Sequence, residues 1–109
     1  MVNVFFTHHG LERIQQRLNC PLNEIYFLAR TVYERVDKRS NNQIVENYRR
    51  WLETKQEGTK TSLYGGFIWF FKEANEGNPL VITMYRFTMD EAIRHALNVN
   101  RHLLKKGHY

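Results

Sequence analysis

Residues 67–73 read Phe-Ile-Trp-Phe-Phe-Lys-Glu, and this stretch decides the fold. Successive side chains of a strand point to opposite faces, so its three odd-numbered aromatic residues would share one face and Ile68 and Phe70 the other. A strand that is apolar on both faces belongs in the interior of a sheet. We therefore predict a central strand whose rings pack in the core. Stacking of these rings on RNA bases is less favoured, because no signature of an RNA-binding sheet accompanies them.

The segments on either side predict its neighbours in the sheet. Residues 59–64 alternate weakly between apolar and polar, and Gly65-Gly66 then forms either a two-residue hairpin turn or a bulge. Residues 75–78, Asn-Glu-Gly-Asn, predict a turn, and residues 79–87 predict another strand. The second half of the chain is therefore expected to contain an antiparallel meander.

The first half of the chain shows mainly the spacing of helices. Residues 2–6 predict a short strand, after which Thr7 is a good N-cap. The next helix has an apolar stripe at i, i+3 and i+7 from Leu11 and runs to about Asn19. Residues 22–36 predict a second helix with a wide apolar face, which we expect to be the central one.

Two more helices are predicted further along. One covers residues 44–52 and carries Glu46 and Arg50 at i, i+4, a spacing that permits an ion pair. The other begins with a capping box formed by Thr88 and Glu91 and runs towards the end of the chain. The expected fold class is α+β, with an N-terminal strand and helices packed on an antiparallel sheet of three or four strands and a long C-terminal helix.

Length and composition bound the class of protein. The 109 residues suit a single domain spanning 1–109, and a 14% aromatic content excludes an intrinsically disordered chain. The net charge is +5 and the isoelectric point is near 9.6, which favours an anionic partner such as nucleic acid.

The cysteine count and the terminal segments bound the setting. Cys20 is the only cysteine, which excludes an intramolecular disulfide and a multi-cysteine zinc site. The N-terminus lacks the features of a signal peptide, and no run of about 18 apolar residues could cross a membrane. We therefore expect a cytoplasmic protein with no membrane partner, no metal and no cofactor.

The first predicted helix carries the most informative side chains. His9, Arg13 and Arg17 are four residues apart, so they line one stripe opposite the apolar stripe. Arginine makes bidentate contacts to phosphate oxygens, and histidine exchanges a proton near neutral pH. The stripe is either a phosphate site or a solvated helix face, and spacing alone favours the solvated face.

Residues 7–19, Thr-His-His-Gly-Leu-Glu-Arg-Ile-Gln-Gln-Arg-Leu-Asn, resemble the opening helix of a small RelE-like family of uncharacterised domains. That helix reads roughly His-Ala-x-x-Arg-x-x-x-Arg-Gly in the family. Residues 80–85, Leu-Val-Ile-Thr-Met-Tyr, are similar to the family's last strand, and residues 64–67 to the entry of the preceding one. Gly10 and Asn19 depart from the pattern, and the third predicted helix looks like an insertion.

The resemblance implies a protein that acts on RNA, because the family lies near the RelE and barnase-type ribonuclease toxins. Such toxins need no metal: the 2′-hydroxyl attacks the adjacent phosphate while basic residues stabilise the developing charge. By analogy, the stripe would lie beside Thr83 and Tyr85, with His9 as base or acid and Tyr85 as an orienting group or acid. Arg13 and Arg17 would stabilise the phosphate. An antitoxin would be a second partner.

The last predicted helix carries most of the net charge. After Glu91 the chain has no acidic residue and gains +4 from four basic side chains, which are Arg94, Arg101, Lys105 and Lys106. A basic helix contacts phosphates without regard to sequence, so these residues are candidate nucleic-acid contacts. Lysines in a last turn also complement the helix dipole of an ordinary solvated helix, and both interpretations stay open.

Two alternatives to an enzyme stay open as well. The additional helix and the basic terminus fit a phage or mobile-element protein that binds a host protein or nucleic acid and so inhibits a host defence or nucleic-acid-processing system. Tyr48 and Trp51 on the third helix fit either core positions or a contact in a homodimer.

Overall fold

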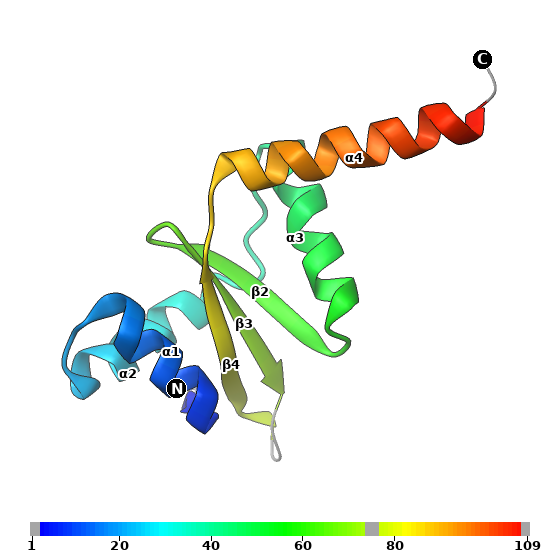
Figure 1. Cartoon of the computed structure of the whole chain (residues 1–109). Coiled ribbons are helices and arrows are strands. Elements are labelled where there is room, and N and C mark those ends of the chain that lie inside the picture. The colour runs from blue at the N-terminus through cyan, green and yellow to red at the C-terminus, as the bar shows by residue number, and fades with distance from the viewer. Residues whose placement is uncertain (1–2, 74–76, 108–109) are drawn as a thin grey trace.

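The computed structural model describes residues 3–73 and 77–107, with side chains described through residue 101. Within these residues the chain forms four helices and one four-stranded sheet with strand order β1-β4-β3-β2. Figure 1 shows the helices arranged around strands β2, β3 and β4. This confirms the α+β class and the long C-terminal helix. The elements in chain order are β1 (Phe5–Phe6), α1 (His8–Leu18), α2 (Leu22–Tyr33), α3 (Gln43–Lys55), β2 (Thr59–Tyr64), β3 (Phe67–Glu73), β4 (Pro79–Arg86) and α4 (Met89–Gly107).

The central strand is β3, as its apolar pattern predicts, and it pairs antiparallel with both β2 and β4. Gly65 and Gly66 form a two-residue turn between β2 and β3, and both have positive φ angles, 62° and 80°. This backbone conformation suits a tight hairpin and favours glycine. The bulge lies instead at Phe70 and Phe71, where the register between β3 and β4 shifts. The turn predicted at 75–78 lies partly outside the described residues.

The sheet is mixed, because β1 pairs in parallel with β4. The sequence predicted a longer N-terminal strand, but β1 has only two residues, and Val2, where the predicted strand begins, lies outside the described residues. The strand ends where Thr7 turns the chain into α1. The Thr7 amide donates to the carbonyl of Val81 at 3.0 Å, and its hydroxyl accepts from the amide of Gly10 at 2.9 Å.

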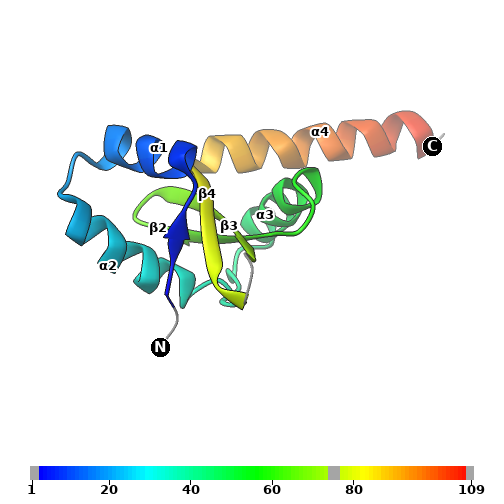
Figure 2. The ribbon, with the colours of Figure 1, turned by 90° about the horizontal axis from the view of Figure 1, so that it is seen from below.

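Helices cover both faces of β3. Trp69 and Phe71 are fully buried on one face, where they belong to the core that α1 and α2 build with β4. Phe70 and Ile68 are buried on the other face, towards α3. Figure 2 shows α2 and α3 on opposite sides of the sheet. The sheet aromatics are therefore core residues, and this confirms the favoured interpretation.

A buried ion pair holds α3 against the loop that precedes it. Glu46 accepts a hydrogen bond from the Ser40 amide at 2.8 Å, and Arg49 donates to the carbonyl of Lys38 at 3.0 Å. The two side chains lie 3.7 Å apart and are almost fully buried. The predicted pair of Glu46 with Arg50 does not form, because Arg50 is exposed while Glu46 faces the loop.

Gly10 sets how closely α1 approaches the sheet. A Cβ atom built at this position would lie 2.5 Å from the carbonyl oxygen of Val81, which belongs to the backbone of β4. Ile14, one turn later, is fully buried against the same core. Glycine at position 10 therefore has a steric cause in this structure.

The variant Gly10→Ala is expected to destabilise the fold. Alanine raises helix propensity by about 1 kcal/mol, but the clash with Val81 forces α1 away from β4, and overpacking of this kind costs about 1–3 kcal/mol. Denaturant unfolding should show a net loss of stability. Gln15→Ala, an exposed change on the same helix, is the control and should lie within about 0.5 kcal/mol of the wild type. Equal stability of the two variants would contradict close docking.

Candidate functional site

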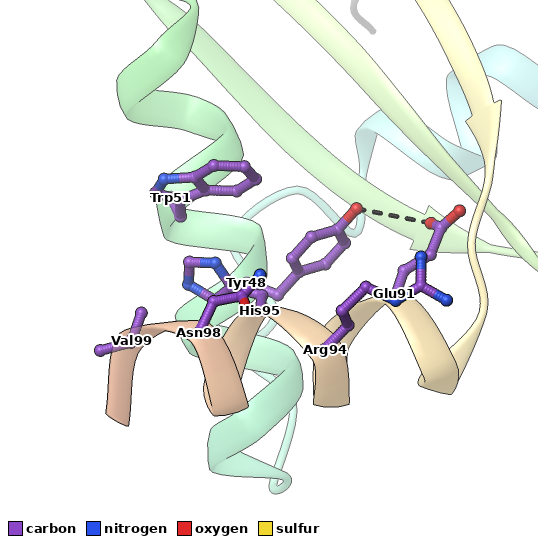
Figure 3. A pocket seen from close by; sticks show the side chains of 7 residues that line it. All are labelled: Tyr48, Trp51, Glu91, Arg94, His95, Asn98 and Val99. Carbon is purple, nitrogen blue, oxygen red and sulfur yellow. Dashed lines mark hydrogen bonds between the residues drawn. The ribbon is translucent and has the colours of Figure 1, made fainter. Parts of the chain in front are cut away.

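Two adjoining hollows lie on the side of the sheet that carries α3 and α4. The first, of about 550 Å³, lies between α3 and α4 (Figure 3). The second, of about 370 Å³, is lined by residues of α1, α3, β3, β4 and α4. Tyr48 and Glu91 line both hollows, so the two form one continuous surface.

A hydrogen bond marks the junction of the two hollows. The Tyr48 hydroxyl donates to Oε2 of Glu91 at 3.4 Å (Figure 3). Burial raises the pKa of Tyr48, and the negative charge of Glu91 and this hydrogen bond raise it further. Only half of the predicted capping box is present: the Glu91 amide donates to the Thr88 hydroxyl at 3.3 Å, while the Glu91 side chain turns to Tyr48.

Aromatic rings form the wall of the first hollow. The His95 ring lies 4.6 Å from that of Trp51 and 5.7 Å from that of Tyr48, measured between centroids. The Nζ of Lys55 lies 4.0 Å from the centroid of Trp51, a cation–π contact. Trp51 is nevertheless 38% exposed. Trp51 is therefore not a core residue but lies with Tyr48 on an accessible surface, and a homodimer contact through the two residues stays a prediction.

The second hollow brings together two of the predicted catalytic residues. The guanidinium carbon of Arg17 lies 5.8 Å from the centroid of the Tyr85 ring, and both residues line the hollow. Tyr85 packs edge-on against Phe70 at 5.7 Å but keeps 42% of its surface exposed. Arg86 lines the same hollow. The exposed ring of Tyr85 and the guanidiniums of Arg17 and Arg86 therefore lie together at the end of β4.

The other predicted site residues lie elsewhere. The Nε of Arg13 donates to Nε2 of His9 at 3.4 Å, and His9 is exposed. Eight residues separate His9 from Arg17, which is a rise of about 12 Å along a helix. Thr83 is buried, and its hydroxyl has no hydrogen-bond partner among the described residues. The structure therefore pairs Arg17 with Tyr85, and His9 with Arg13.

The basic residues predicted as nucleic-acid contacts on the last helix also lie in different places. Arg94 lines the first hollow, whereas Arg101 is exposed further along α4. The side chains of Lys105 and Lys106 lie outside the described residues.

The charged residues that line the hollows are mostly basic. Arg17 and Arg86 line the second hollow and Arg94 the first, against the single carboxylate of Glu91. Arg86 and Lys55 belong to no motif in the sequence that would have indicated a site. The i, i+4 spacing of Trp51 and Lys55 on α3 is the one signal that could have indicated their contact.

Metal-binding clusters and membrane spans are both absent from the described part of the chain. Among the described side chains, those of residues 3–73 and 77–101, no group of three histidine, cysteine or acidic residues could bind a metal ion. Over the same ranges, no helix has both the length and the apolar character needed to span a bilayer.

Comparisons with known proteins leave the geometry as the main support for a function. No protein-family model matches the chain, and no curated protein or solved structure matches it either. The resemblance to RelE-like domains therefore rests on the short motifs in α1, in β4 and at the β2–β3 turn.

The raised pKa of Tyr48 predicts a pH effect on stability. A folded-state pKa above the unfolded value of 10.0 means that the contribution is present below about pH 10 and is lost as the pH rises through the folded-state pKa. Wild-type stability should therefore fall more steeply in this alkaline range than that of Tyr48→Phe, when both are measured by denaturant unfolding. Glu91→Gln should bring the pKa of Tyr48, followed by tyrosinate absorbance, closer to 10. An unchanged titration in Glu91→Gln would contradict the contact.

Proposed function

We propose that this chain binds single-stranded RNA across the two hollows. The observation that carries the proposal is the contact of Arg17 with the exposed ring of Tyr85. Single-stranded nucleic acid is bound by aromatic rings that stack on bases and by guanidiniums that contact phosphates, and this contact places one of each side by side. The compartment we propose is the cytoplasm.

The first hollow supports the proposal because it repeats this combination. Trp51 offers a second exposed ring, and Arg94 a second guanidinium, on a surface continuous with that of Arg17. Glu91, the one carboxylate in the lining, already accepts a hydrogen bond from Tyr48. The net charge of +5 adds a general attraction for phosphates.

A second candidate function is metal-independent cleavage of the bound RNA, which the resemblance to RelE-like domains supports. In that reaction the 2′-hydroxyl gives its proton to water and attacks the adjacent phosphorus, the bond to the 5′-oxygen breaks and that oxygen takes up a proton, and a 2′,3′-cyclic phosphate forms. Arg17 would stabilise the charge that develops on the phosphate, and Tyr85 would orient the group or protonate the leaving oxygen. His9 is too far along α1 to share that phosphate, so the base role does not fall on it.

Binding is tested by the fluorescence anisotropy of a labelled single-stranded RNA. Loss of one stacking ring costs about 1–3 kcal/mol, so Tyr85→Ala should weaken binding by about 5- to 150-fold. Arg17→Ala should weaken binding and also lower the slope of log affinity against log salt by about 0.7. Lys60→Ala removes one charge from the opposite face of the sheet and is the control. Wild-type protein that binds no RNA at low salt would overturn the proposal.

Cleavage is tested with the same RNA under saturating protein and a chelator. If the chain is a ribonuclease, Arg17→Ala should lose about 10²–10³-fold in rate, as removal of one charge-stabilising donor does elsewhere. His9→Ala should retain the wild-type rate, since His9 is distant from the Arg17–Tyr85 pair. RNA that stays intact with the wild type would leave binding alone as the function.

A further inference from the structure

One side of α4 contacts α3, and the other side carries a partly exposed apolar stripe. Ala92 is fully buried, and His95 contacts the rings of α3. Met89, Ile93 and Leu97 are 40%, 40% and 56% exposed. These three residues are four apart and form one stripe, and Ile93 lies about 200° around the helix from His95. The stripe therefore faces away from α3.

The length of α4 adds to the exposure of this stripe. Its 19 residues span about 28 Å, and its distal half projects beyond α3 and the sheet (Figures 1 and 2). The projection accounts for the elongated shape, whose extents are 55 × 30 × 25 Å. A projecting helical segment of this kind is marginal in water without packing, so a partner on its apolar stripe would stabilise it.

We propose that a second copy of this chain covers the stripe, with the two α4 helices packed antiparallel. The charges beside the stripe support this choice of partner. Asp90 and Arg101 are eleven residues apart, so they lie within about 20° of each other on the same flank. In an antiparallel pair the same flanks of the two helices meet, with the first turn of one beside the distal part of the other.

The apolar and charged contacts agree on one register. When Ile93 packs against Leu97 of the partner subunit, Asp90 lies beside Arg101 of the partner subunit. Opposite charges then meet at both ends of the pair, and the two helix dipoles are antiparallel. A parallel pair would instead place the two acidic first turns at the same end and leave Asp90 without Arg101 of the partner subunit beside it, which disfavours it.

This interface is separate from the proposed RNA surface. The hollows lie on the α3 side of α4, so the dimer leaves them open. The proposal does not depend on RNA binding, and the two are tested by different measurements.

Sedimentation equilibrium of the purified chain tests the dimer. The wild type should rise in mass from 13.2 kDa towards twice that value as its concentration increases. Leu97→Glu should raise the dissociation constant by about tenfold or more, because a charge then faces the stripe of the second copy. Val99→Glu is the matched control, since Val99 is 43% exposed but lines the α3 side of the helix. It should dimerise like the wild type.

Charge exchange tests the orientation of the helices. Asp90→Lys and Arg101→Glu should each weaken self-association, because like charges then meet at both ends of the antiparallel pair. An equimolar mixture of the two variants should form a heterodimer as readily as the wild type dimerises. Circular dichroism that matches the wild type shows that each variant is folded, since all these positions are on the surface. A wild type that stays monomeric, or Val99→Glu that dissociates as readily as Leu97→Glu, would overturn the proposal. So would single charge variants that dimerise as tightly as the wild type.

Discussion

Burial of both faces of β3 is the constraint on which the rest of the structure depends. Trp69 and Phe71 need cover on one face, and Ile68 and Phe70 on the other. A single layer of helices cannot do this, so the chain places α1 and α2 on one side and α3 on the other. Because α3 lies over the second face, α4 packs against α3 when it leaves β4. The first hollow forms between α3 and α4, and the second forms where these elements leave the end of β4 uncovered.

This arrangement explains why the ring of Tyr85, on β4, stays accessible. The register between β3 and β4 pairs Tyr85 with Ile68 and Thr83 with Phe70. Thr83 is buried towards the middle of the sheet, while Tyr85 lies two residues nearer its end and stays partly exposed. Arg17, at the last turn of α1, is within reach of that end. His9, at the first turn of the same helix, lies about 12 Å back along the axis.

Local periodicity is the part of the fold that could be predicted from the sequence. Alternation in residues 67–73, the Gly65-Gly66 pair and the stripe from Leu11 all depend on neighbours in the chain, and the structure contains the corresponding strand, turn and helix. A strand of two residues has no period to detect, so the parallel pairing of β1 with β4 could not be predicted. This is why the sheet is mixed, although an antiparallel one was expected.

The site depends on contacts between distant residues, and these carry no local signal. Helical spacing groups His9, Arg13 and Arg17, but only the docking of α1 on β4 decides which of them meets Tyr85, 68 positions after Arg17. Glu91 shows the same limit. A capping box predicts that the Glu91 carboxylate accepts a hydrogen bond from the backbone of its own helix. It accepts one instead from Tyr48, 43 positions earlier in the chain.

The two sides of α4 differ because of this packing. The side that carries His95 and Glu91 contacts α3 and completes the hollows, while the stripe through Ile93 and Leu97 lies on the opposite side and stays partly exposed. A helix that served only to close the hollows would need a polar outer side, since exposed leucine and isoleucine in a row add nothing to that role. That side carries three apolar residues, with an acidic first turn at one end and a basic distal part at the other. Such a surface is complementary to the same surface on a second copy of the chain. Self-association through this side would bury the stripe and keep the basic and aromatic side free for a separate partner.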